Sequence, residues 1–153
     1  MNIVMSLENK IMTSMKESMK SKDQTSLRAL RAIKSAIILQ KTQKGSSEEI
    51  SNDDELKILQ KLVKQRKDSA DIYQDQDRMD LAQPELDEIK IIEQFLPEAM
   101  SEEEVENEVK KVIGETGAEG MKDMGKVMGI VTKKLMGKTD GKTISTIVRN
   151  NLN

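Results

Sequence analysis

Apolar residues recur every three or four positions along almost the whole chain, and this spacing constrains the fold more than any other sequence feature. In one stretch the apolar stripe consists of Leu27, Leu30, Ile33 and Ile37. This spacing places apolar side chains on one face of an α-helix. With one tyrosine, one phenylalanine and eleven methionines, the core must be aliphatic and methionine-rich. The sequence therefore predicts an all-α fold, and no strand is expected.

The first part of the chain is predicted to contain four helices. The first is expected from about Ser6 to Met19, with an apolar stripe of Val4, Leu7, Ile11, Met15 and Met19. The second follows a cap at Asp23 and stops near Gly45, where a Gly-Ser-Ser sequence breaks the pattern. The third begins at Ser51, and its predicted buried face consists of Leu56, Leu59, Val63, Ala70 and Tyr73.

A polar turn is predicted over residues 74–80, before the fourth helix. Pro84 stands either at the first position of that helix or at a kink within a longer one. The pair Leu96–Pro97 ends it, because a proline disfavours helical geometry in the preceding residue.

Three shorter helices are predicted after this proline. A capping box of Ser101 and Glu104 begins the fifth helix, which ends near Glu115 and is followed by a glycine-rich loop over residues 114–120. The predicted inward residues are Val105, Val109, Val112 and Ile113 in the fifth helix, Met124, Met128, Val131 and Leu135 in the sixth, and Ile144, Ile147, Val148 and Leu152 in the seventh, which Asp140 caps. Gly125 and Gly129, four residues apart, predict a close helix crossing.

The segment from Pro97 to Ser101 is the predicted domain boundary, because a helix stop is followed directly by a helix start. We expect an N-terminal four-helix bundle domain over residues 1–97 and a small three-helix domain over residues 98–153. A domain of about 55 residues is near the lower limit for independent folding, so the second domain is expected to be only marginally stable.

The chain has no histidine, cysteine or tryptophan, which argues against catalysis and metal binding. Histidine and cysteine are the residues used most for general base catalysis near neutral pH, covalent attack and zinc binding. We therefore predict no catalytic residues, no metal and no cofactor. No signal peptide and no apolar stretch near the ~20 residues of a membrane span is visible, so a cytoplasmic location without membrane contact is expected.

Positive charge is concentrated near the C-terminus. Over residues 124–145, one acid, Asp140, stands against five lysines: Lys126, Lys133, Lys134, Lys138 and Lys142. Lysines at the ends of two helices can bind the phosphates of a polyanion, assisted by helix N-terminal amides. These five residues are candidate nucleic-acid contacts.

A second basic group precedes this one in the sequence, and its candidate contacts are Arg31, Lys34, Lys57, Lys61 and Lys64. The last three are spaced by four and three residues, so they share one helix face. The alternative interpretation is a solvated face balanced by the acids of residues 68–88. Because aromatic residues for stacking are nearly absent, any nucleic acid bound is expected to be folded or duplex RNA or DNA that is recognised by its shape.

Arg66 is different, because it falls within the apolar stripe of the third predicted helix. A guanidinium group there must be paired, and Glu88 or Glu93 on the next helix is the predicted partner.

Four ordered motifs resemble the GatB/YqeY family. They are Leu30–Ser35; Lys64–Ser69 with Tyr73; Phe95–Glu98 followed by Met100–Glu103; and Asp123–Gly129 running into Lys134–Gly141. The resemblance implies a two-domain helical protein whose last domain is similar to the tail of the B subunit of tRNA-dependent amidotransferases, which helps to hold tRNA. Gly129, Gly137, Lys138 and the helix after Asp140 match that tail, but Asp140–Gly141 replaces its common Asn-Pro. The catalytic cradle of the amidotransferase has no counterpart here.

Three functions remain open on these grounds. The first is a non-catalytic accessory module that binds tRNA or another folded RNA, alone or with a tRNA-processing enzyme. The second is a protein–protein adaptor that docks on an acidic partner. The third, carbon–nitrogen ligase activity of the chain itself, is the weakest, because no catalytic apparatus is visible in the sequence.

Overall fold

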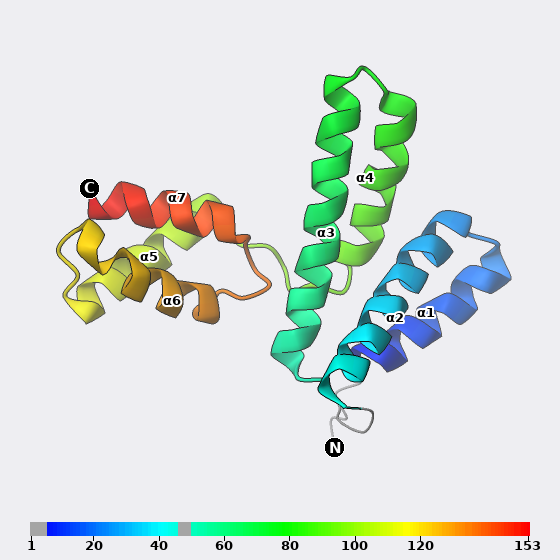
Figure 1. Ribbon diagram of the computed structural model, residues 1–153, viewed down its shortest axis with the longest axis horizontal. Coiled ribbons are helices and arrows are strands. Elements are labelled where there is room, and N and C mark those ends of the chain that lie inside the picture. Colours follow the sequence, from blue (N-terminus) through cyan, green and yellow to red (C-terminus); the bar gives the residue numbers. More distant parts are fainter. Residues whose placement is uncertain (1–5, 46–49) are drawn as a thin grey trace. The chain divides into compact units, whose positions relative to one another are not determined.

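A computed structural model describes residues 6–45 and 50–153, so the predicted role of Val4 lies outside the described residues. The described residues form seven α-helices and one short 3₁₀ helix, and they contain no strand (Figure 1). The helices are α1 Leu7–Ser21, α2 Gln24–Lys44, α3 Asn52–Asp75, α4 Met79–Glu93, α5 Glu102–Thr116, η1 Met121–Asp123, α6 Met124–Lys134 and α7 Gly141–Leu152. The all-α prediction is confirmed.

Side-chain caps begin most of these helices at the predicted residues. The caps are Ser6 of α1, Asp23 of α2, Ser51 of α3, Ser101 of α5 and Asp140 of α7. In each case a side-chain oxygen accepts a hydrogen bond from the backbone amide three residues later. Each such bond satisfies an amide that the helix leaves unpaired, and contributes about 1 kcal/mol.

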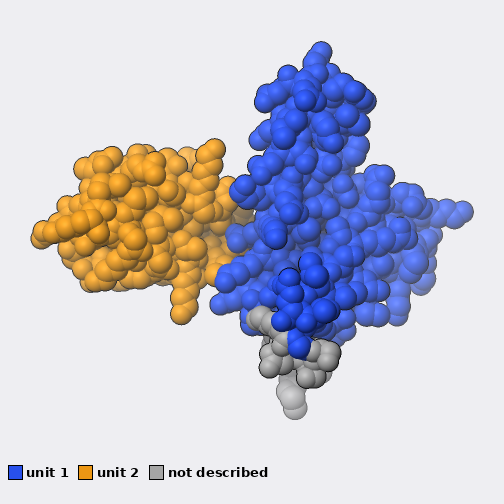
Figure 2. All heavy atoms as spheres, viewed as in Figure 1, with its two compact units in different colours: residues 1–96 blue, residues 97–153 orange. Residues whose placement is uncertain are grey.

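The chain divides into two compact units, shown in different colours in Figure 2. Unit 1 is Met1–Leu96 and contains α1 to α4, whereas unit 2 is Pro97–Asn153 and contains α5, η1, α6 and α7. Each unit has a hydrophobic core of its own. Folding of the two units as independent domains stays a prediction.

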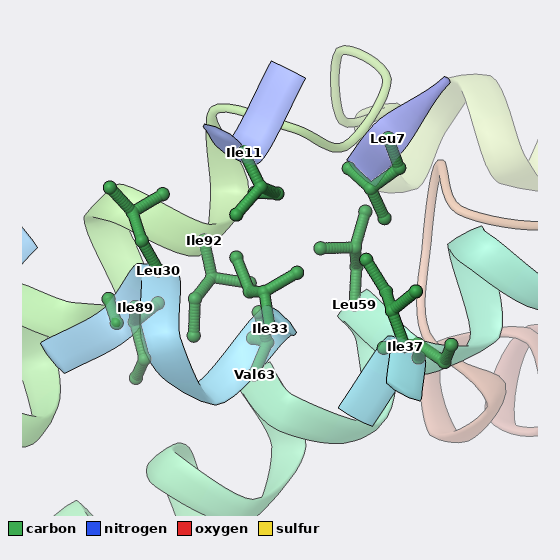
Figure 3. Packing of buried hydrophobic residues seen from close by; sticks show 11 residues of the cluster. Leu7, Ile11, Leu30, Ile33, Ile37, Leu59, Val63, Ile89 and Ile92 are labelled. Atoms are coloured by element: carbon green, nitrogen blue, oxygen red, sulfur yellow. The ribbon is translucent and has the colours of Figure 1, made fainter. Parts of the chain in front are cut away.

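All four helices of unit 1 contribute to its core (Figure 3). The predicted α2 stripe of Leu27, Leu30, Ile33 and Ile37 is buried throughout. The predicted α3 face is buried at Leu59, Val63 and Ala70, but Leu56 and Tyr73 are only half-buried and Ile58 is buried instead of Leu56. The start of α1 is joined to α3, because the Leu7 amide donates to the Glu55 carboxylate over 2.7 Å.

Helix α4 is longer at its start and shorter at its end than predicted. It begins at Met79, so the turn is shorter than residues 74–80, and Pro84 lies within the helix rather than at its first position. It ends at Glu93 instead of Leu96. The backbone amides after Glu93 donate to carbonyls three residues earlier, as the Phe95 amide does to the Ile92 carbonyl. This 3₁₀-type bonding ends the α-helix before Pro97.

Unit 2 has a smaller core of nine buried residues. Helix α5 contributes Val105, Val109 and Val112, α6 and its C-cap contribute Val127, Val131 and Leu135, and α7 contributes Ile144, Val148 and Leu152. The prediction for α6 was partly wrong, because Val127 is fully buried whereas Met124 and Met128 lie at the edge of the core. Ile113 and Ile147 are also only partly buried.

The glycines of unit 2 differ from their predicted roles. Gly114 belongs to α5, and Gly117, at φ 68°, ends that helix in the left-handed conformation. The predicted close helix crossing at Gly125 and Gly129 is wrong, because both are exposed and an added Cβ would meet no atom within 4 Å. Helix α6 packs through its opposite face, where Val127 and Val131 lie.

Within the part of the chain that the structure describes, no helix is both long and apolar enough to cross a membrane.

Brief digestion with proteinase K is expected to cut the chain first within residues 97–101 or 117–120. Pro97, Glu98 and Ala99 are exposed and belong to no helix, and a protease needs such an extended segment. Mass spectrometry of the fragments checks this prediction. A first cut within residues 56–70, inside α3, would contradict the division into two domains.

Candidate nucleic-acid interface

The outer face of α6 carries two of the predicted lysines. Lys126 and Lys133 are exposed, and at seven residues apart they lie on nearly the same side of the helix. Gly129 and Ile130 lie between them on this face, and Ile130 is also exposed. The helix backbone is therefore accessible between two ammonium groups.

Lys134, next in sequence to Lys133, points to a different neighbour. Its Nζ lies 2.9 Å from Oε2 of Glu108 on α5. This contact with Lys134 lowers the pKa of Glu108, and in return it raises the pKa of Lys134. Its charge is therefore already matched by a carboxylate, which makes Lys134 a weaker candidate for binding phosphate than Lys133.

Lys138 lies in the hinge between α6 and α7. Gly137 before it has φ 83°, a left-handed conformation that glycine adopts without a Cβ penalty. The Lys138 carbonyl accepts a hydrogen bond of 2.9 Å from the Met100 amide, which joins the start of unit 2 to this hinge. The Lys138 side chain is exposed and lines a cavity of about 400 Å³ that Glu98 and Glu104 also line. These two carboxylates reduce the attraction of an anion to Lys138.

Lys142 is exposed in the first turn of α7. The positive end of the helix dipole repels a cation at this position, and a nearby anion offsets this repulsion. The Asp140 cap supplies one negative charge, and its Oδ1 accepts the Thr143 amide over 2.7 Å.

A further exposed lysine, Lys122 in η1, was not among the predicted contacts. The 3₁₀ helix was not predicted, because three residues are too short to show an apolar period. Residues 121–153 carry seven basic residues and two acids, whereas α5 carries six acids and two lysines. The positive charge of unit 2 is thus concentrated on η1, α6, the hinge and α7.

The candidate residues of unit 1 lie on two helices. On α2, Arg31 is exposed and Lys34 is half-buried. On α3, Lys57, Lys61 and Lys64 are all exposed, so the structure brings these three together on one face as predicted. Lys64 also pairs with Asp68, its neighbour one turn further along α3, at 3.0 Å. The positive charge of Lys64 is therefore balanced by the carboxylate of Asp68, as expected if this basic face is simply a solvated helix face.

Arg66 has the structural role that the sequence predicted. Its Nε lies 3.9 Å from Oε2 of Glu88 on α4, and both side chains are mostly buried, with 15% and 14% of their surface exposed. Its Nη1 also donates a hydrogen bond of 3.1 Å to the Leu62 carbonyl. The predicted ion pair is confirmed with Glu88, the first of the two candidate partners.

The candidate residues of unit 2 offer exposed ammonium groups and open helix backbone. Among the residues that the structure describes, no group of three acidic, histidine or cysteine side chains is placed to hold a metal ion. The geometry fits contact with a phosphate backbone, which needs exposed cations that are free to move toward it.

Comparison with known proteins extends the resemblance seen in the sequence. A search of the curated proteins gives no match. The family model described as Yqey-like protein matches residues 8–152, which is almost the entire chain. This chain therefore belongs to the YqeY-like family.

Proposed function

We propose that this YqeY-like chain is a non-catalytic accessory module that binds tRNA or another folded RNA through unit 2. The observation that carries the proposal is the outer face of α6, where exposed Lys126 and Lys133 lie on either side of exposed Gly129. Phosphate contacts of this kind are independent of base sequence and position a protein on a nucleic-acid backbone.

Two further features support RNA as the ligand. An exposed glycine inside a helix costs about 1 kcal/mol relative to alanine, and at Gly129 no internal packing requires it, because nothing lies within 4 Å of an added Cβ. A close approach of a phosphate to the backbone would give this position a role. In addition, Gly129, Gly137 and Lys138 match positions in the amidotransferase tail that the sequence resembles.

The adaptor function is a second candidate, favoured by apolar side chains on the surface. Those with roughly half of their surface exposed include Met12, Met19, Ile38, Leu39, Ile72 and Met79. Exposed apolar residues that gather in one patch are typical of protein-binding surfaces, whereas single ones are normal. In this proposal the basic faces dock on an acidic protein instead of RNA.

Neutralising Lys126, Lys133 and Lys142 together by glutamine is expected to weaken tRNA binding and its salt dependence. The slope of log affinity against log salt concentration should flatten by roughly two to three units, because about one counterion is released per lost contact. Fluorescence anisotropy of labelled tRNA at several salt concentrations measures this. The matched control replaces Lys10, Lys16 and Lys20, three exposed lysines of α1, and should leave the slope unchanged.

A single substitution separates binding from folding. Gly129→Ala is expected to raise the free energy of unfolding by about 0.5–1 kcal/mol, since alanine favours the helix. The added methyl group should nevertheless weaken tRNA binding, because it occupies the space in which a phosphate is proposed to approach the backbone at this position. If the wild-type chain shows no salt-dependent binding to tRNA at micromolar concentration, the RNA proposal is wrong and the adaptor remains.

A further inference from the structure

The C-terminal end of α3 carries an exposed apolar residue between exposed acids. Ile72 has 55% of its surface exposed, and Asp68 and Asp75 stand four residues before it and three residues after it. At 100° per residue, the two aspartates lie within about 60° of Ile72 around the helix. The three side chains therefore share one face.

The surroundings of Ile72 are strongly acidic. Residues 68–80, which cover the end of α3, the turn and the start of α4, contain five acids and one base, Arg78. Met79 and Leu81, directly after the turn, are also exposed. Exposed apolar residues on an acidic surface fit a partner that is both apolar and basic.

Helix α6 of the same chain has this complementary composition. Ile130 has 40% of its surface exposed, and Lys126 and Lys133 stand four residues before it and three residues after it. The spacing equals that of Asp68, Ile72 and Asp75, with the sign of both charges reversed. Met121 and Lys122 of η1, the short helix just before α6, are also exposed.

We propose that the α3 face of one copy, formed by Asp68, Ile72 and Asp75, docks on the α6 face of a second copy, formed by Lys126, Ile130 and Lys133. In both helices the charged residues span seven positions, or about 10 Å along the axis. When the two isoleucines pack together, both lysines therefore reach the two aspartates. The exposed ion pair of Asp68 with Lys64 does not prevent this, because such pairs are worth about 0–1 kcal/mol.

Helix α6 is shaped for a close contact of this kind. Gly129 lies next to Ile130 in sequence and is exposed, and the space where its Cβ would lie is open. A neighbouring helix can approach closely over a glycine, so the isoleucine contact can be tight. Since every copy carries both faces, one copy can bind a second copy through this contact.

The contact would also regulate access to the candidate RNA site. Lys126 and Lys133 cannot bind a second copy and phosphates at once, so dimerisation and RNA binding should compete. This consequence rests on the proposed function, whereas the self-association does not.

Sedimentation equilibrium of the full chain without RNA, over a series of concentrations at low salt, is the first test. A monomer–dimer equilibrium that weakens as salt is added is expected, because the contact is electrostatic and exposed. A strictly monomeric chain up to ~1 mM, a range that covers weak contacts, would overturn the proposal. A compaction of the monomer at low salt in sedimentation velocity that does not depend on concentration would also contradict it, because it would place the contact within one copy.

Charge reversal tests the assigned faces. Asp68→Lys with Asp75→Lys, and separately Lys126→Glu with Lys133→Glu, are each expected to raise the dimer dissociation constant at least about tenfold, since like charges then oppose each other. An equimolar mixture of the two variants should dimerise again, because each variant carries the face that the other requires. Failure of the mixture to recover would refute the pairing even if both variants are folded by circular dichroism.

The apolar part of the contact has its own control. Ile72→Ser and Ile130→Ser should each weaken dimerisation, whereas Ile38→Ser, at an equally exposed isoleucine of α2, should not. Equal effects of the three substitutions would contradict a specific contact. Since these measurements contain no RNA, they can fail while tRNA binding succeeds, and the reverse is also possible.

Discussion

Replacing Ile33 by alanine is expected to lower the free energy of unfolding of unit 1 by about 4 kcal/mol. Ile33 has no exposed surface and lies in a core cluster to which α1, α2, α3 and α4 all contribute (Figure 3). Truncation of such a residue loses its transfer free energy and leaves a cavity, which together cost about 2–5 kcal/mol. Ile38→Ala is the matched control, because Ile38 is half exposed on the same helix and should cost far less.

Two signals in urea denaturation separate the units. Tyr73 is the only tyrosine and the chain has no tryptophan, so tyrosine fluorescence reports on unit 1 alone. Circular dichroism reports on the helices of both units. Ile33→Ala should shift the fluorescence transition to lower urea and leave a second circular dichroism transition, from unit 2, in place. If the two signals shift together, the units unfold as one and the prediction of two domains is wrong.

Arg66→Ala is expected to destabilise unit 1 by about 2–4 kcal/mol, because it leaves the largely buried Glu88 carboxylate without its partner. The lost hydrogen bond to the Leu62 carbonyl adds to this cost. Lys61→Ala, on the exposed face of the same helix, should change the stability by less than about 0.5 kcal/mol. Denaturation followed by tyrosine fluorescence measures both variants.

A double variant tests the cause of this effect. Arg66→Met together with Glu88→Leu should recover most of the lost stability, since apolar pairs of similar size replace buried ion pairs at little cost. If the double variant is as unstable as Arg66→Ala, the loss comes from a contact that methionine cannot make, such as the hydrogen bond to the Leu62 carbonyl, rather than from an unpaired charge. Equal effects of Arg66→Ala and Lys61→Ala would place Arg66 on the exposed face.

The candidate site could be predicted only in part. The exposure of Lys126, Lys133 and Lys142 follows from the helical period, because each lies away from the apolar stripe of its own helix. The partner of Lys134 could not be predicted, since Glu108 belongs to a different helix and 26 positions separate them in sequence. The cavity beside Lys138 likewise requires residues 97–104 to meet the hinge.

The sequence by itself determined where the helices with side-chain caps begin and which faces are apolar. A cap such as Ser101 needs only the amide three residues later, and a stripe such as Leu30, Ile33 and Ile37 needs only the helical period. The position of Arg66 within its stripe also followed from this local geometry, and burial then required an acidic partner.

Only the tertiary structure decided which apolar residues at the edge of a stripe are buried, and what the glycines of α6 do. Val127 is buried and Met128 is not, because the positions of α5 and α7 select one part of a broad apolar face. Gly125 and Gly129 share a spacing that suits a helix crossing, yet no helix of unit 2 crosses there. Both outcomes depend on contacts between residues distant in sequence, and such contacts are not encoded in the local period of any one helix.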